Sequence, residues 1–435
     1  MRNKEITQRK TKILATLGPS SNTIKKIIEL SKAGANAFRL NCSHLNEQGL
    51  KDYVKKIRRA EKILNKPIGI LVDLQGPKIR IGKVKDGENI LKKDSIFLLD
   101  LKKEIGNYKR VTLPHKKIFS SAKNGHLILL DDGKIHLKVT SVKANEIRTK
   151  VLQGGLLKSN KGVNLPQTNI RTSALSSIDK KFASIAVQEG VDWIALSFVQ
   201  KPNDIKELRK ICLNKVSIMA KIEKPTALDY INEIADLADG IMIARGDLGV
   251  ELPIESVPGW QKKIIRVARV KGRPVVVSTQ MLESMTSSLT PTRAEVSDVA
   301  NAVFEGADAI MLSAESASGD YPVETVKMMN KIAINIEKDS NYNDILSSQL
   351  EDTPDTTPDA IAVAAKTLAD ELSAPIIVCY TESGSTGIKV SRVRPSQTIL
   401  TITPVVQTAR KLSLAWGVLC FLQKDESDLE HMINL

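Results

Sequence analysis

The chain has 435 residues, more than one ordinary domain uses, so two to four domains with self-sufficient cores are expected. Hydrophobic residues at 42% and charged residues at 26% are typical of globular proteins, whereas 4% aromatics argue against a stacking platform for single-stranded nucleic acid. The net charge of +15 fits a nucleic-acid binder, an enzyme for anionic phosphates or a lysine-rich composition, and does not choose among them.

Cysteine usage and hydropathy indicate a cytoplasmic protein. The first apolar run is short and ends at Gly18-Pro19, unlike a signal peptide. No stretch is long and apolar enough to cross a membrane, so no membrane partner is expected. Four cysteines lie far apart without a CxxC pair, which favours a reduced compartment; they are Cys42, Cys212, Cys379 and Cys420.

In chain order, short apolar runs recur with helical patterns between them. A run that is apolar on both faces is typical of a buried parallel strand. Runs of this kind alternating with helices predict an α/β fold, a (β/α)₈ TIM barrel. The runs are Ile13–Leu17, Ala37–Leu40, Ile68–Val72, Trp193–Phe198, Ser217–Ala220, Gly240–Ala244, Pro274–Ser278 and Ala309–Leu312.

The helix expected after the first run has clear start and stop signals. Ser20, Ser21 or Asn22 is expected to cap it, and Gly34 to end it. A later helix with the same apolar periodicity is expected over residues 293–305.

One stretch breaks the barrel rhythm. From about Pro77 to Leu175 the helical period nearly vanishes, and turn pairs such as Asp86-Gly87 separate short alternating runs. This predicts an all-β domain inserted after the third strand, where it can act as a lid over the active face. A polar linker near residue 347 precedes a smaller α/β domain. We therefore expect the barrel over residues 1–76 and 176–346, the lid over 77–175 and a C-terminal domain over 347–435.

Polar and charged side chains follow most of the apolar runs. The carboxyl ends of barrel strands are where barrel enzymes place their chemistry. Capping and solvation explain one or two such residues, but not the whole set. The second run is followed by Arg39, Asn41, Ser43 and His44, the third by Asp73, and the fifth by Lys221 and Glu223. The sixth is followed by Arg245 and Asp247, the seventh by Thr279 and Gln280, and the eighth by Ser313 and Glu315.

The residue types limit the chemistry. Glu223 and Asp247 are hard oxygen ligands on neighbouring strands, which suits Mg²⁺, although a surface salt bridge also uses such residues. Arg39 and Lys221 are cations directed at the same mouth, and phosphoryl transfer uses Arg, Lys and a divalent metal. Lys221 could instead form a Schiff base, as in barrel aldolases, but the nearby Glu223 favours the metal interpretation.

A glycine-bearing turn spans residues 244–249. If a short helix starts there, its free N–H groups could hold a substrate carboxylate. The sequence contains no Walker A loop, no GxGxxG after a strand, no HExxH and no GxSxG, which argues against common nucleotide-binding and hydrolase sites.

A set of ordered segments resembles the pyruvate kinase family from about Thr11 to Arg394. The resemblance implies barrel domain A, lid B and α/β domain C. It implies transfer of the phosphoryl group of phosphoenolpyruvate to ADP, giving pyruvate and ATP, with Mg²⁺ or Mn²⁺. The segments are TKILATLGPSS, RLNCSH, DLQGPKIR, DDGKI, KGVNLP, KIEKP, ARGDLGVELP, STQMLESM, PTRAEVSDVANAV and MLSAESASGDYP.

The resemblance also implies a role for each matching residue. Arg39 would hold the transferring phosphoryl group, and Lys221 would stabilise it in flight. Glu223 and Asp247 would bind the divalent metal. The substrate carboxylate would bind at Ala244, Arg245, Gly246 and Asp247. The carbon to be protonated would lie beside Thr279, with Ser313 and Glu315 in the proton relay. The nucleotide would face Arg80, His44, Asn41 and Lys161.

The resemblance implies independence from potassium. Asn41, Ser43, Asp73 and the Leu74 carbonyl match the family's monovalent-cation pocket, but potassium-dependent members typically carry Glu where this chain has Lys78. A tethered ammonium can replace a bound cation of similar charge, although Lys78 could also simply face solvent.

The chain stops at Leu435, before the strand hairpin that usually completes domain C, so a shortened C-terminal domain is expected. The loop from Thr381 to Thr386 resembles the family's sugar-phosphate effector loop, and it equally fits an ordinary helix N-cap that needs no effector. The family's assembly implies a homotetramer.

Two alternative functions are weighed against this one. A metal-dependent aldolase or lyase on the same barrel would need neither the lid nor the nucleotide-facing basic residues. A nucleic-acid-binding protein is supported only by the net charge, and many basic residues lie on ordinary helical faces such as Lys51–Lys62. Nucleic acid is therefore not an expected partner.

Overall fold

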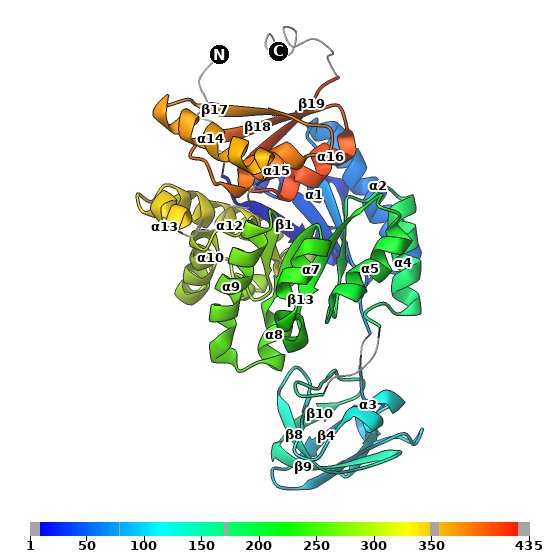
Figure 1. Cartoon of the computed structure of the whole chain (residues 1–435). Helices are drawn as coiled ribbons and strands as arrows, with labels where there is room; N and C mark the ends of the chain where they lie inside the picture. Colours follow the sequence, from blue (N-terminus) through cyan, green and yellow to red (C-terminus); the bar gives the residue numbers. More distant parts are fainter. Residues whose placement is uncertain (1–8, 78, 169–172, 349–355, 425–435) are drawn as a thin grey trace.

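The computed structural model describes residues 9–77, 79–168, 173–348 and 356–424. Three bodies follow one another along the long axis: a C-terminal α/β domain, a central barrel and a β-rich lid (Figure 1). No helix in these residues is both long enough and apolar enough to span a bilayer.

In the described part of the chain, eight parallel strands close into a barrel, so the predicted fold class is confirmed. Each predicted apolar run corresponds to one strand, within about two residues at either end. Around the barrel, β1 (Lys12–Thr16) is followed by β2 (Ala37–Asn41), β3 (Gly69–Asp73), β12 (Trp193–Leu196), β13 (Ser217–Ile222), β14 (Gly240–Ala244), β15 (Val275–Ser278) and β16 (Ala309–Leu312), which pairs with β1.

The first barrel helix, α1 (Ile24–Ala33), begins one residue later than the predicted caps allow. Thr23 caps it, because its Oγ1 accepts a hydrogen bond from the Lys26 N–H at 3.2 Å. Ser20, Ser21 and Asn22 are therefore wrong as caps. The chain first makes a separate 3₁₀ turn, Pro19–Ser21, which includes both serines. Gly34 ends the helix as predicted, with φ of 131°.

Helices cover the outside of the barrel. The predicted later helix is α10, which a capping box between Thr292 and Glu295 starts. The barrel helices after α1 are α2 (Glu47–Leu64), α4 (Ser177–Gln188), α5 (Pro202–Cys212), α6 (Pro225–Asp229), α7 (Ile231–Leu237), α8 (Arg245–Glu251), α9 (Val257–Val270), α10 (Arg293–Phe304), α11 (Ala314–Ala317), α12 (Pro322–Glu337) and α13 (Tyr342–Ser348).

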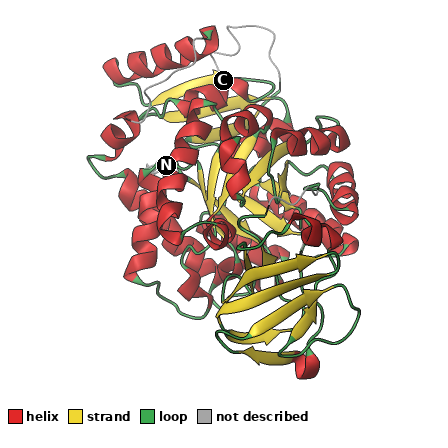
Figure 2. Ribbon diagram, turned by 60° about the horizontal axis from the view of Figure 1, so that its bottom comes forward, coloured by secondary structure: helices red, strands yellow, loops and turns green. Residues whose placement is uncertain are grey.

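The inserted domain is β-rich, with one short helix that the all-β prediction did not include. Ile118 and Phe119 of that helix, α3 (Lys116–Ser121), pack into the lid core. The described strands form a two-stranded sheet, β10-β4, and a larger sheet ordered β11-β7-β8-β9-β5-β6 (Figure 2). Their bounds are β4 (Glu88–Leu91), β5 (Ile96–Asp100), β6 (Arg110–Thr112), β7 (Leu127–Leu130), β8 (Ile135–Lys143), β9 (Glu146–Gln153), β10 (Gly155–Lys158) and β11 (Val163–Asn164).

The C-terminal domain packs against the amino ends of the barrel strands. The Lys12 ammonium donates to the Val418 carbonyl at 2.8 Å, and the Trp193 indole donates to the Lys411 carbonyl at 3.3 Å. A parallel sheet, β17-β18-β19, carries this domain. Its described elements are α14 (Thr357–Glu371), β17 (Ile376–Tyr380), α15 (Ser385–Arg392), β18 (Thr398–Thr403), α16 (Val406–Lys411) and β19 (Val418–Leu422).

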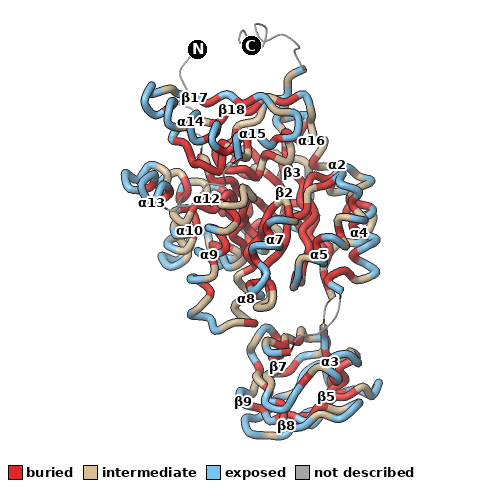
Figure 3. The backbone as a smooth tube through the Cα atoms, in the orientation of Figure 1, coloured by how far each residue is buried: buried red, intermediate tan, exposed pale blue. Residues whose placement is uncertain are grey.

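The barrel has two apolar layers, which appear as a buried centre in Figure 3. One layer lies between strands and helices and is the larger cluster. The other fills the barrel interior and includes Trp193, Met219, Met242 and Val276. Because both faces of most of these strands are buried, most charged side chains of the strands lie at or near their ends.

Asp308, just before β16, joins the barrel to the C-terminal domain. Its carboxylate lies 3.1 Å from Nη2 of Arg394, and it accepts hydrogen bonds from the backbone N–H groups of Val275 at 3.0 Å and Trp416 at 3.2 Å. We expect Asp308→Ala to lower the free energy of unfolding by about 3–5 kcal/mol, because it leaves a buried guanidinium without its partner.

Urea unfolding followed by circular dichroism measures this loss. Glu29→Gln, which breaks the exposed Lys26–Glu29 pair, is the control and should leave the midpoint unchanged. Equal midpoints for the two variants would contradict the prediction.

Candidate active site

Asp73, at the end of β3, lies between two cations in the barrel mouth. Arg39 of β2 donates from Nε to Asp73 Oδ2 at 2.7 Å, and Lys221 of β13 places Nζ 3.1 Å from Oδ1. Burial acts to raise the pKa of Asp73, but Lys221 and Arg39 outweigh it and hold the pKa below its usual value. The carboxylate is therefore charged and bridges the two cations.

Lys221 has two further partners. Its Nζ lies 2.8 Å from Glu223 Oε1 and donates to Ser197 Oγ at 2.8 Å. Burial acts to lower the pKa of Lys221, but Asp73 and Glu223 outweigh it, so the pKa lies above its ordinary value. A lysine must lose its proton to act as a nucleophile, so this environment argues against the Schiff-base alternative.

Glu223 and Asp247 bring two carboxylates to the same mouth. Glu223 Oε2 accepts from the Phe198 N–H at 2.9 Å. Asp247 lines the same cavity as Glu223, and within the described residues its carboxylate has no hydrogen bond or ion pair. Desolvation by the surrounding protein and the charge of Glu223 raise the pKa of Asp247 to about 6.

This donor set fits a divalent cation. Two crowded carboxylates, one of them without a partner, repel each other until a cation binds. No group of three or more His, Cys, Asp or Glu side chains forms a metal cluster in the ranges the structure covers. Mg²⁺ commonly takes one or two carboxylates and completes its shell with water and substrate oxygens, so two suffice.

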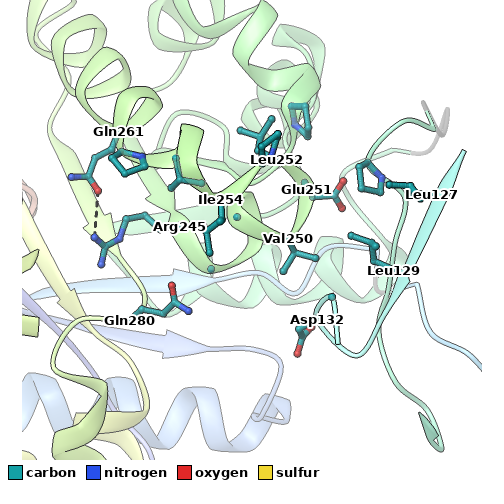
Figure 4. Close-up of a pocket in the computed structure, with 18 of the residues that line it drawn as sticks. Leu127, Leu129, Asp132, Arg245, Val250, Glu251, Leu252, Ile254, Gln261 and Gln280 are labelled. Atoms are coloured by element: carbon teal, nitrogen blue, oxygen red, sulfur yellow. Dashed lines mark hydrogen bonds between the residues drawn. The ribbon is translucent and has the colours of Figure 1, made fainter. Parts of the chain in front are cut away.

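A cavity of about 300 Å³ connects this cluster with the lid. Arg39, Lys221, Glu223 and Asp247 line its barrel side, and Arg80 lines its lid side. A larger cavity of about 1060 Å³ lies beside it, between β7 of the lid and the α8–α9 region (Figure 4). Arg39, Lys221 and Glu223 do not line the larger cavity, so the smaller cavity is the candidate active site.

The two lid-side basic residues are engaged with the lid itself. Lys161 places Nζ 2.8 Å from Asp131 Oδ1, and Arg80 donates to the Asn160 carbonyl at 3.0 Å. His44 is exposed on the loop after β2. The structure thus brings Arg80 to the cavity wall, whereas Lys161 and His44 do not line it.

The lid touches the barrel through Glu251. Its Oε1 accepts from the Asn164 amide of β11 at 2.9 Å and also pairs with Lys224. This contact joins the lid to the barrel.

The residues of the expected monovalent-cation pocket lie together at the ends of β2 and β3. Asn41 Oδ1 accepts from the Ser43 N–H at 3.0 Å, and the Leu74 carbonyl accepts from Ser197 Oγ at 2.8 Å. Asp73 is already paired with Arg39 and Lys221. Lys78, expected to replace the cation, lies outside the described residues.

The short helix expected after β14 is α8, which begins directly at Arg245. The Gly246 N–H donates to Thr279 Oγ1 at 2.7 Å. Arg245 turns its side chain away from the mouth, toward Asp298 of α10 at 2.5 Å, so only its backbone belongs to the expected carboxylate turn. The backbone of Ala244, at the end of β14, completes that turn.

Glu315 follows β16 and is 2% exposed. Its Oε2 accepts from the Ser313 N–H at 2.6 Å. Burial raises the pKa of Glu315 to about 7, which makes it an acid poised near neutrality. Neither residue lines the cavity of about 300 Å³.

Sequence analysis missed Ser197, which bridges Lys221 and the Leu74 carbonyl. A signal existed, because Ser197 directly follows β12 and the fourth apolar run was taken to extend past it. It also assigned no role to Asp131, the partner of Lys161, although Asp131 begins the segment DDGKI that resembles the family.

Comparisons with known proteins agree with this geometry. The barrel-domain model of pyruvate kinase matches residues 8–326, and its alpha/beta-domain model matches residues 359–435. The chain belongs to the pyruvate kinase family.

Individual relatives cover nearly the whole chain. A pyruvate kinase of Methylorubrum extorquens is 49% identical over 424 residues, which are 98% of this chain and 89% of that protein. One from Geobacillus stearothermophilus is 40% identical over 94% of this chain and 71% of its own length. The crystal structure of a pyruvate kinase from Cryptosporidium parvum matches with a TM-score of 0.95 and 33% identity, covering 100% of this chain and 91% of that one.

These findings confirm the family, the fold class and the reaction expected from the sequence. Members of the family are phosphotransferases that convert phosphoenolpyruvate and ADP to pyruvate and ATP, generally with Mg²⁺ or Mn²⁺. The aldolase and lyase alternatives are therefore wrong.

The raised pKa of Glu315 predicts a pH-dependent stability. Folding favours its protonated form, so its stabilising contribution is complete below its ordinary pKa of 4.5 and is lost as pH rises through about 7. Glu315→Gln removes this titration. The melting temperature of the variant minus that of the unmodified protein should therefore be larger at pH 8 than at pH 5. A difference in melting temperature that is the same at both pH values would contradict this.

Proposed function

We propose that this chain catalyses the family's reaction in the mouth cavity, with phosphoryl transfer centred on Arg39 and Lys221. The observation that carries the proposal is the pairing of both cations with one buried carboxylate, Asp73, beside Glu223 and Asp247. Phosphoryl transfer needs fixed positive charge around the transferring group more than it needs covalent help from the protein.

Each cation has a distinct role in this proposal. Arg39 presents a planar fork that suits two phosphoryl oxygens. Lys221 stays protonated between Asp73 and Glu223 and stabilises the same group as it moves. Mg²⁺ or Mn²⁺ held by Glu223 and Asp247 would neutralise charge on the substrate when bound.

The second half of the reaction protonates an enolate. The backbone N–H groups of the Ala244–Asp247 turn hold the substrate carboxylate, which places the enolate carbon near Thr279. The Thr279 hydroxyl and the Ser313–Glu315 pair are the polar groups at the neighbouring strand ends β15 and β16. We assign them to the proton relay, which Glu315 suits because its pKa is about 7.

The nucleotide binds between barrel and lid. Arg80 and Asn41 already line the cavity, and His44 is exposed on the loop after β2. Lys161 reaches the phosphates only when it leaves Asp131, which fits a lid that moves on binding. The same proposal includes a homotetramer and a location in the cytoplasm. The reducing cytoplasm suits the four cysteines, which are free thiols.

Lys221→Met should reduce ATP formation from phosphoenolpyruvate and ADP by about 10³-fold or more, because it removes the charge that follows the phosphoryl group. A lactate-dehydrogenase-coupled assay measures it. Lys262→Met, at an exposed lysine paired with Glu305 at 3.9 Å, is the matched control and should retain activity. A loss of less than tenfold in Lys221→Met would refute the role.

We further propose that potassium is not required, because Lys78 supplies the monovalent charge. Activity in a tetramethylammonium buffer should equal activity with added potassium within about twofold. Lys78→Glu should make the enzyme potassium-dependent. A stimulation of tenfold or more by potassium in the unmodified enzyme would overturn the proposal.

A further inference from the structure

The turn that carries Thr279 has an unusual backbone. Thr279 has φ of 69° and the next residue, Gln280, has φ of 56°. A β-branched residue rarely adopts the left-handed region, because its side chain crowds the backbone there. Such strain persists only where surrounding contacts enforce it.

The Thr279 side chain and carbonyl are both held. Its Oγ1 accepts from the Gly246 N–H at 2.7 Å and donates to the Ser278 carbonyl at 2.6 Å. Its carbonyl oxygen accepts from Nη2 of Arg245 at 2.7 Å. The Arg245 guanidinium therefore holds the backbone of the turn at the Thr279 carbonyl. The Gly246 N–H and the Ser278 carbonyl hold the Thr279 hydroxyl.

Asp298, about one and a half turns into α10, orients the Arg245 side chain. The two side chains form a two-point pair, with Nη1–Oδ1 at 2.5 Å and Nη2–Oδ2 at 2.7 Å. Gln261 of α9 accepts from Nη1 at 3.5 Å, the bond drawn in Figure 4. The planar guanidinium thus reaches Asp298, Gln261 and the Thr279 carbonyl at once, which a lysine cannot do.

We propose that Arg245 and Asp298 are positioning residues for enolate protonation, acting by holding Thr279 in its left-handed turn. This rests on the proposed function, in which Thr279 lies at the carbon to be protonated. In that step the new C–H bond of pyruvate forms as an O–H bond of the relay breaks. The relay oxygen then regains a proton from solvent, so protons and electrons balance without another reactant.

The two cations that serve phosphoryl transfer, Arg39 and Lys221, have no hydrogen bond or ion pair with Arg245 or Asp298 in the described part of the chain. Arg39, Asp73 and Lys221 lie on β2, β3 and β13. Within the described residues, their side chains form hydrogen bonds and ion pairs with one another and with Glu223, Ser197 and Thr16. Relaxation of the Thr279 turn therefore displaces the relay hydroxyl and leaves the two cations in place. The proposal predicts a selective loss of proton transfer.

Two rates separate the halves of the reaction. ATP formation from phosphoenolpyruvate and ADP reports phosphoryl transfer. Exchange of pyruvate methyl protons in D₂O, followed by NMR with Mg²⁺ and ATP present, reports enolate protonation run in reverse. In Asp298→Asn the exchange rate should fall at least tenfold, and the ratio of exchange to ATP formation should fall at least fivefold. Asp298→Glu, which keeps the charge, should recover part of that ratio.

Arg245→Lys is the second variant, and it should lower the ratio in the same way. Asp239→Asn is the matched control, because Asp239 pairs with Arg209 at 2.6 Å at the opposite end of the strands; its ratio should not change. An unchanged ratio in folded Asp298→Asn or Arg245→Lys, with both rates falling together or neither falling, would overturn the inference. A fall in the control of the same size would also overturn it. Absence of ATP formation in the unmodified protein would instead refute the proposed function.

Discussion

The mouth depends on one buried carboxylate, Asp73, that lets two cations sit next to each other. An isolated guanidinium or ammonium loses several kcal/mol of hydration when it is buried, and two of them also repel. Asp73 accepts from Arg39 at Oδ2, and Lys221 lies within 3.3 Å of both carboxylate oxygens. The cations are therefore fixed in place before any anion arrives, which is the condition under which electrostatic stabilisation is effective.

Strand register explains how the chain builds this arrangement. Asn41 of β2 lies directly opposite Asp73 of β3, and Arg39 is two residues earlier on the same face. Lys221 comes from β13, separated from β3 by β12, and Ser197 at the end of β12 fills the gap between them. A slip of one residue in any of these pairings would turn the charged groups away from the mouth.

The sequence predicted the barrel and the main charged residues because both follow from burial. Strands buried on both faces leave charge only at their ends, so Asp73, Lys221 and Asp247 could be found by where the apolar runs stop. Even so, β13 continues through Lys221 to Ile222, which shows that a long side chain with partners can remain within a strand.

What escaped prediction depends on contacts between distant segments. Asp298 holds Arg245 across 53 residues, and nothing in the spacing of α10 distinguishes it from a solvent-facing helical residue. The left-handed conformation of Thr279 was equally hidden, since its residue type disfavours that conformation. The Thr23 cap was missed because three earlier polar residues offered the same chemistry and only the 3₁₀ turn decides between them.

The inserted lid also has a consequence for how the chain reaches its native state. The Ile70 N–H donates to the Asp192 carboxylate across 122 residues. The Thr16 N–H of β1 donates to the Ser316 hydroxyl of α11, just after β16, across 300 residues. Loop closure over such distances is entropically costly, although the cost grows only with the logarithm of loop length. A lid that collapses first would draw the ends of β3 and α4 together and shorten the effective loop. Because β1 pairs with β16, the amino-terminal strands stay incompletely paired during synthesis until the last barrel strand has left the ribosome.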